Sequence, residues 1–171
     1  MNKKYNEKHI TKPIFIFTLS IISLAALLSG MLMQAKHGHY YSITSGQSME
    51  KTLNNGDKLL IKNYNGKQLK RGDIVSFDLY IDSERVSVLK RVIGLPNEVI
   101  KVKGNEVYID NQLIDEKYAY YSDLNEDNFS FALGDNEYFV MGDNRCDSLD
   151  SRAFGAIPKD IIEGVLVSYK D

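Results

Sequence analysis

The sequence predicts a mainly β domain built from antiparallel strands and preceded by one N-terminal transmembrane helix. After residue 44, short segments rich in Val, Ile, Tyr and Phe alternate with turn residues, which is the pattern of successive strands. Before it, residues 14–33 carry no charged side chain, and no amphipathic helical period appears beyond that run. At 171 residues, the chain has room for one domain of moderate size beside this apolar segment.

The apolar run at residues 14–33 is long enough to cross a bilayer, because twenty helical residues span about 30 Å. Four lysines and one acid precede it, so the positive-inside rule places residues 1–13 in the cytoplasm and the C-terminal part outside the cell membrane. The alternative is a cleaved signal peptide, which needs a shorter apolar region followed by small residues; residues 34–37 fit that poorly. We therefore expect a retained single-pass anchor at 14–33, a juxtamembrane linker at 34–44 and an extracellular domain at 45–171.

Seven segments of the C-terminal part are predicted to be strands: residues 59–63, 74–81, 85–93, 98–103, 106–110, 138–141 and 161–169. Asp110-Asn111 fits a two-residue hairpin turn, because both residue types tolerate a positive φ. Gly164 within the last segment indicates a β-bulge. Residues 118–136 are polar, acidic and aromatic, and are expected to form a long loop or part of a small cap insertion spanning 104–136.

Composition argues against several classes of function. The net charge is -2 with a pI near 5.9, and the basic residues are dispersed among acids, so a nucleic-acid-binding face is not expected. Cys146 is the only cysteine, which rules out an internal disulfide. All three histidines precede residue 40, which argues against Ser-His-Asp or Cys-His catalysis and against a histidine-containing metal site in the domain. No cofactor is implied.

A candidate nucleophile, Ser48, lies in the segment SGQSMEKTLNNGD at residues 45–57, between small or flexible residues and an Asn-Asn-Gly-Asp turn. Gly46 allows close backbone approach, and a sharp loop here could aim a backbone N–H at a developing oxyanion. Met49 and Leu53 are apolar residues in a polar loop, and they could form core or face the membrane or a substrate. The alternative for Ser48 is an ordinary turn serine.

Lys90 is the candidate general base. In the segment VSVLKRVIG it shares its parity with three valines, so a strand would point it to an otherwise apolar face: Val86, Val88 and Val92. Burial there should lower the pKa of Lys90, and a neutral amine can accept a proton from a serine hydroxyl. The alternative is a lysine at a strand end whose ammonium reaches water.

A third polar stretch, MGDNRCDSLDSRAFGAI at residues 141–157, is dense in short side chains that hydrogen-bond locally. Asp150 and Arg152 could pair and brace this loop, and the alternative is a surface loop with a routine ion pair. The acids of this stretch do not follow the twelve-residue calcium-binding pattern.

These stretches, in this order after an N-terminal anchor, resemble bacterial type I signal peptidase of the Gram-positive type: the serine box SGQSMEKTLNNGD, the strand LKRGDIVSF, the lysine box LKRVIGLPNEVI and the C-terminal box MGDNRCDSLDSRAFGAI. The resemblance implies a signal-peptidase-like, partly open barrel of antiparallel sheets. It implies that Ser48 is the acylated nucleophile and that Lys90 is the general base. Ser148 would orient the lysine amine, and Asp150 and Arg152 would form a supporting ion pair. The implied activity is a membrane-bound serine endopeptidase that removes signal peptides from exported preproteins with small residues before the cleavage site.

Several positions depart from the usual pattern of this family. Lys51 stands where the serine box usually has proline, Asn97-Glu98 where the lysine box usually has Gly-Asp, and Cys146 where an acid is common. Gly46 is similar to the branch that forms its oxyanion hole from backbone groups. Non-catalytic relatives act in pilus assembly and lose residues of the Ser–Lys pair, whereas both residues are present here. That chaperone function, or a membrane-tethered β domain that only binds, is the alternative.

Overall fold

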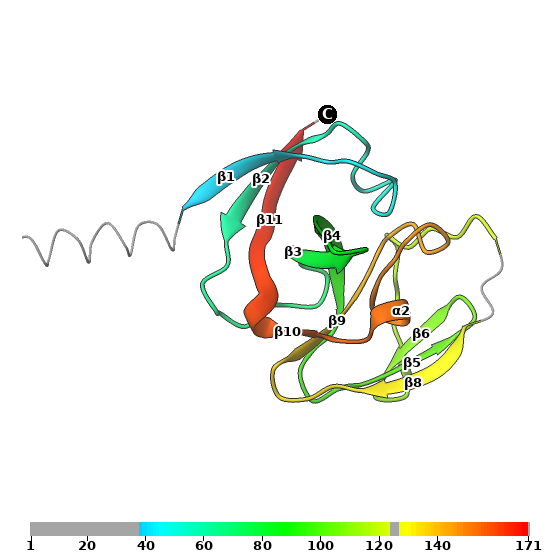
Figure 1. The fold of residues 1–171 in the computed structure, drawn as a ribbon. Coiled ribbons are helices and arrows are strands. Elements are labelled where there is room, and N and C mark those ends of the chain that lie inside the picture. Colours follow the sequence, from blue (N-terminus) through cyan, green and yellow to red (C-terminus); the bar gives the residue numbers. More distant parts are fainter. Residues whose placement is uncertain (1–37, 124–126, 171) are drawn as a thin grey trace, which may run out of the picture. The chain divides into compact units, whose positions relative to one another are not determined.

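The computed structural model describes residues 38–123 and 127–170 (Figure 1). Contacts between residues divide the chain into two units, and all elements described below belong to the unit His39–Asp171. The expected cytoplasmic tail and the anchor at residues 14–33 lie outside the described residues. Within the described part, no helix is long and apolar enough to cross a membrane.

The larger of two sheets has seven strands, and every neighbouring pair in it is antiparallel. In spatial order the strands are β1 (His39–Ile43), β2 (Lys58–Asn63), β11 (Ile162–Lys170), β3 (Ile74–Ile81), β4 (Glu84–Gly94), β9 (Glu137–Met141) and β10 (Ile157–Pro158). β3 pairs with β4 along its whole length, whereas β9 pairs only with the end of β4, from Arg91 to Gly94. Among the described residues, the first half of β4 therefore keeps one free edge. The prediction of a mainly antiparallel β fold is confirmed.

A smaller four-stranded sheet lies beside the larger one (Figure 1, green to yellow). Its order is β7 (Gln112–Leu113), β6 (Glu106–Ile109), β5 (Val99–Lys103) and β8 (Asn128–Ala132). β9 connects the two cores, because Tyr138 and Val140 pack into the core of the larger sheet while Phe139 and Met141 pack against the smaller one. Residues 104–136, the expected insertion, supply three strands of this sheet, and β5 precedes them.

Two predicted local features are present and have clear backbone causes. Asp110 and Asn111 have φ values of 49° and 67°, and they connect β6 to β7 with Ile109 opposite Gln112. Gly164 lies at a register shift between β11 and β3, which is the expected bulge. A Cβ at Gly164 would lie 2.4 Å from Ile61 Cγ2, so there is no room for a side chain at this position of β11.

The sequence analysis missed two strands, β1 and β8. β1 lies within the segment 34–44 that the sequence predicts as a linker, and each of its five residues pairs with β2. Its inward side is Tyr40 and Ser42 and its outward side is Tyr41 and Ile43, so hydrophobicity does not reveal which face is buried. β8 falls in the predicted long loop at 118–136 and pairs along β5. The short α2 helix (Ser151–Phe154) is a single turn capped by the preceding residue.

Candidate active site

Ser48 lies in the loop between β1 and β2, here called the serine loop (residues 44–57). Backbone hydrogen bonds from Thr44 to Asp57 and from Gly56 to Thr44, both 3.0 Å, close its base. Met49 and Leu53 are buried in the core beneath it, which fixes one side of the loop while Ser48 stays half-buried. The backbone N–H of Ser48 has no acceptor among the described residues, and it is free to bind an oxyanion.

The amine of Lys90 lies against Ser48. Lys90 is on β4 and only 3% exposed, and its Nζ donates a hydrogen bond of 2.7 Å to Ser48 Oγ. Burial lowers the pKa of Lys90 to about 8, although the negative charge of Asp150 opposes the change. The alternative of a lysine whose ammonium reaches bulk water is therefore wrong. The arrangement places a readily deprotonated amine within hydrogen-bond distance of a hydroxyl.

Asp150 and Arg152 form the predicted ion pair, and it is buried rather than at the surface. The carboxylate of Asp150 accepts two hydrogen bonds of 2.9 Å from Arg152 and one of 3.0 Å from the Gly142 backbone. Burial alone would raise the pKa of Asp150, but Arg152 and these hydrogen bonds lower it below its ordinary value. Arg152 also donates to the Arg145 carbonyl at 2.6 Å, so the pair holds the C-terminal loop (residues 142–152) in one shape.

Ser148 lies in this loop with its hydroxyl buried. Its Oγ makes no hydrogen bond to any described residue, including Lys90. Its proximity to the Asp150 carboxylate contributes to lowering the Asp150 pKa, although the geometry falls short of a hydrogen bond. A Cβ at Gly142 would lie 2.2 Å from Ser148 Oγ and 2.5 Å from the Ser48 carbonyl oxygen, so a glycine there lets the two loops meet. The role of Ser148 as an orienting group stays a prediction.

The sequence did not predict a second ion pair that joins three segments of the site. Arg91, the neighbour of Lys90, donates to both carboxylate oxygens of Asp143, at 2.8 and 2.5 Å. Asp143 also accepts from the Thr52 hydroxyl at 2.5 Å, and the Asn144 backbone N–H donates to the Ser48 carbonyl at 3.1 Å. These bonds tie the serine loop, β4 and the C-terminal loop together. The only sequence signal was an arginine pointing away from the face of Lys90.

The chain matches the sequence model described as "Signal peptidase, peptidase S26" over residues 14–169. This chain belongs to the S26 signal peptidase family. It is 33% identical to Signal peptidase I of Bacillus licheniformis over 171 residues, covering 92% of this chain and 90% of that one. It is 34% identical to Signal peptidase I T of Bacillus subtilis (strain 168) over 156 residues, covering 84% and 78%. The resemblance to bacterial type I signal peptidase is confirmed.

A solved structure supports the same assignment. The crystal structure of a signal peptidase I from Enterococcus faecalis V583 matches with a TM-score of 0.50 and 31% identity, covering 59% of this chain and 98% of that chain. The signal-peptidase-like character of the fold is therefore shown. The non-catalytic pilus-assembly alternative is not favoured by these relatives, each of which is named as a signal peptidase.

The departures from the signal peptidase pattern are accommodated by local structure. Lys51 has a φ of 72°, which proline cannot adopt, and its ammonium lies 3.4 Å from the centre of the Tyr120 ring. Asn97 has a φ of 68°, a conformation that asparagine tolerates nearly as well as the usual glycine. Glu98 accepts hydrogen bonds of 2.8 and 2.6 Å from Arg71, so it provides a carboxylate as the usual aspartate would.

A second buried arginine of this signal peptidase fixes the loop between β7 and β8. Arg145 donates to both oxygens of Glu116, at 2.8 and 2.6 Å, and to the Tyr121 hydroxyl at 2.8 Å. Its Nε donates to the Gly142 carbonyl at 3.0 Å. No pattern in the sequence indicates this contact, because the partners lie 29 residues apart in segments without regular periodicity. Cys146, which follows Arg145, is exposed.

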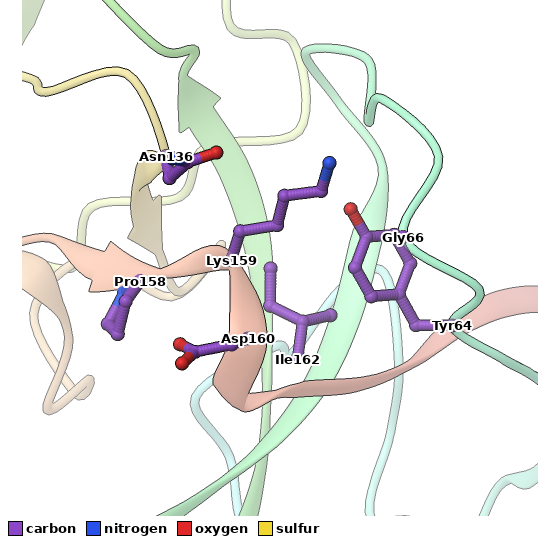
Figure 2. A pocket seen from close by; sticks show the side chains of 7 residues that line it. All are labelled: Tyr64, Gly66, Asn136, Pro158, Lys159, Asp160 and Ile162. Atoms are coloured by element: carbon purple, nitrogen blue, oxygen red, sulfur yellow. The ribbon is translucent and has the colours of Figure 1, made fainter.

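A groove of about 260 Å³ adjoins Ser48 and Lys90. Its walls come from β1, the serine loop and β4, and Ile61 and Ser76 lie among its lining residues. A larger pocket of about 540 Å³ lies elsewhere, where Tyr64 and Lys159 face each other across it (Figure 2). That pocket contains no candidate nucleophile beside a base, so the smaller groove is the candidate substrate site.

Proposed function

We propose that this chain is a membrane-anchored serine endopeptidase that removes signal peptides from exported preproteins, with Ser48 as nucleophile and Lys90 as general base. The observation behind this proposal is the 2.7 Å contact between the Ser48 hydroxyl and a buried amine whose pKa is about 8. Membership of the S26 signal peptidase family supports the reaction class and the substrate class.

In this mechanism the neutral Lys90 amine accepts the hydroxyl proton while Ser48 Oγ attacks the scissile carbonyl carbon. The carbonyl oxygen becomes an oxyanion, and the Ser48 backbone N–H stabilises it, with Gly46 giving the loop its sharp turn at a φ of 99°. Collapse of the intermediate breaks the peptide bond, and Lys90 returns the proton to the leaving amine of the mature protein. Water activated by Lys90 then hydrolyses the acyl-enzyme that holds the signal peptide.

The substrate would bind in the groove as an extended strand. β1 is the edge of the larger sheet, and the part of β4 before Arg91 pairs only with β3, so both present unpaired backbone groups. Met49 and Leu53 contribute apolar side chains to the groove near Ser48, where a small residue before the cleavage site would fit. The Asp150–Arg152 pair would keep the C-terminal loop, which carries Ser148, in place beside the serine loop.

The membrane anchor is proposed at residues 14–33, with the N-terminus in the cytoplasm and the β domain outside. The match to the family begins at residue 14, where the apolar run begins. Protease added to intact cells should digest the β domain, and protection of the domain would show that this orientation is wrong.

A precursor-cleavage assay tests the activity directly. Wild-type protein should release the signal peptide, while Ser48→Ala should not, because it removes the attacking oxygen and little else. Thermal unfolding of both proteins serves as the control for folding. Equal cleavage by a folded Ser48→Ala protein would exclude the proposed nucleophile.

A further inference from the structure

The groove beside Ser48 contains a pair of hydroxyl groups. Tyr40 on β1 and Ser76 on β3 lie with their oxygens 3.0 Å apart, and both line the groove. Two strands, β2 and β11, separate β1 from β3 in the sheet order. The Tyr40 side chain can reach Ser76 because Gly164 on β11, which lies opposite Ser76, has no side chain between them. A Cβ at Gly164 would lie 2.9 Å from the Tyr40 oxygen and 2.8 Å from the Ser76 oxygen.

The burial of the two residues decides the direction of this hydrogen bond. Ser76 is only 2% exposed, and Tyr40 is its only hydrogen-bond partner among the described residues. If Tyr40 donated, the Ser76 hydrogen would be buried without an acceptor, which is costly. If Ser76 donates, the half-buried Tyr40 keeps its own hydrogen free on the groove side. The second arrangement satisfies the buried group and leaves a free donor in the groove.

The position of the pair indicates which substrate residue it would meet. Strand alternation points Ser76 and its partner Leu89 away from the face of Lys90, but the two hydroxyls line the same groove as Ser48 and Lys90. In an extended chain, alternate side chains point to the same face and are roughly 7 Å apart. If the residue before the scissile bond faces the sheet beside Ser48, the third residue before the bond is the next one to do so.

We infer that the Tyr40 hydroxyl is a specificity-determining group that donates a hydrogen bond to a serine side chain at the third substrate residue before the cleavage site. The inference rests on the proposed function and refines its substrate class. Ile61 and Leu89 also line the groove, so alanine fits the same place. Serine at that position gains the hydrogen bond, which corresponds to a preference of about three- to tenfold over the same site without the donor.

The test compares kcat/KM for two peptides that differ only by Ser or Ala at the third residue before the cleavage site. Tyr40→Phe removes the hydroxyl alone and should lower the Ser-to-Ala ratio about three- to tenfold. Tyr41→Phe is the matched control, because Tyr41 is its neighbour on β1, is 83% exposed and faces the other way; its ratio should equal that of the wild type. A second peptide pair with Ser or Ala at the second residue, which faces away from the sheet, should show no change in either variant.

Tyr40→Phe also leaves the Ser76 hydroxyl buried without its partner, which could disturb folding. The double variant Tyr40→Phe, Ser76→Ala removes both hydroxyls and should show the same lowered ratio. An unchanged ratio in both variants, or an equal change at the second substrate residue, would overturn the inference while leaving Ser48-dependent cleavage intact. Cleavage of the alanine peptide that does not depend on Ser48 would overturn the proposed function and this inference together.

Discussion

Lys90 and Arg91 are adjacent on β4, and both are cations largely removed from water, but their surroundings differ. Arg91 pairs with the buried carboxylate of Asp143 through two hydrogen bonds. Lys90 has no carboxylate within ion-pair distance among the described residues, and its amine bonds to the Ser48 hydroxyl instead. Burial therefore lowers the pKa of Lys90 to about 8, while Arg91 forms an ion pair with Asp143. Lys90 is thus a candidate base and Arg91 a structural brace. The difference is that Arg91 has a carboxylate partner and, within the described part of the chain, Lys90 does not.

Replacing Lys90 by another cation should have the largest effect on cleavage. Lys90→Arg keeps the charge, but a guanidinium does not deprotonate in proteins, so turnover should fall by about 10²–10⁴-fold or more. The measurement is the single-turnover rate of precursor cleavage at fixed enzyme concentration. Substantial cleavage by Lys90→Arg would exclude the general-base role, because an arginine can hold a substrate but cannot accept the serine proton.

Removing the charge of Arg91 should lower the free energy of unfolding instead of the rate of proton transfer. Arg91→Met leaves Asp143 buried with an unpaired charge, and breaking such a pair costs about 3–5 kcal/mol of unfolding free energy. Urea unfolding measures this loss. In the fraction that remains folded, cleavage should persist with a pH midpoint moved upward, because the unpaired Asp143 carboxylate favours the charged form of Lys90. Unchanged stability would show that Arg91 is not a brace.

The pH dependence gives a sharper test of Lys90. Cleavage should rise with pH through a midpoint near 8, because the neutral amine is the active form. The free energy of unfolding should also depend on pH through the titration of Lys90. Its pKa is lowered from 10.5 in the unfolded chain, so the unfolded chain binds more protons between about pH 8 and 10.5, and stability rises with pH in that window. Below pH 8 the full cost of the buried charge, roughly 3 kcal/mol, is present.

Lys90→Met separates the two effects. It should abolish cleavage, be at least as stable as the wild type at pH 7, and lose the gain in stability between pH 8 and 10.5, because methionine keeps the packing without a titratable group. Urea midpoints at pH 7 and pH 10 give the comparison. A wild-type protein whose stability does not rise over this range would show that the amine is not buried in solution.

Local structure was predictable where one side-chain pattern was sufficient. The segment predicted at 74–81 is the strand Ile74–Ile81, because its β-branched and aromatic residues lie between clear turn signals. The turn at Asp110-Asn111 follows from the tolerance of both residues for positive φ. The contact between Ser48 and Lys90 spans 42 residues and could not follow from periodicity; only the family resemblance predicted it.

The braces of the site were less predictable than its central pair. Arg91 and Asp143 are 52 residues apart, and many other charge pairings were equally compatible with the sequence. Which pairing forms depends on the register of β4 against β9, in which Arg91 lies opposite Met141. Register is a property of the assembled sheet, and the side-chain pattern of one strand does not define it.

Lys51 extends the comparison to a cation that water can reach, and its effects should be the smallest. Its ammonium lies over the Tyr120 ring in an exposed setting, where a cation–π contact contributes about 0.5–1 kcal/mol. Lys51→Met should therefore lower stability by no more than about 1 kcal/mol.

Lys51→Pro should lower stability more, although proline is usual at this position in the family, because a proline ring cannot adopt the φ of 72°. Lys51→Gly removes the same side chain and tolerates that φ, so it is the matched control. Urea unfolding should rank the proline variant clearly below the glycine variant. The reverse order would mean that residue 51 adopts a negative φ in solution, as a proline at this position requires.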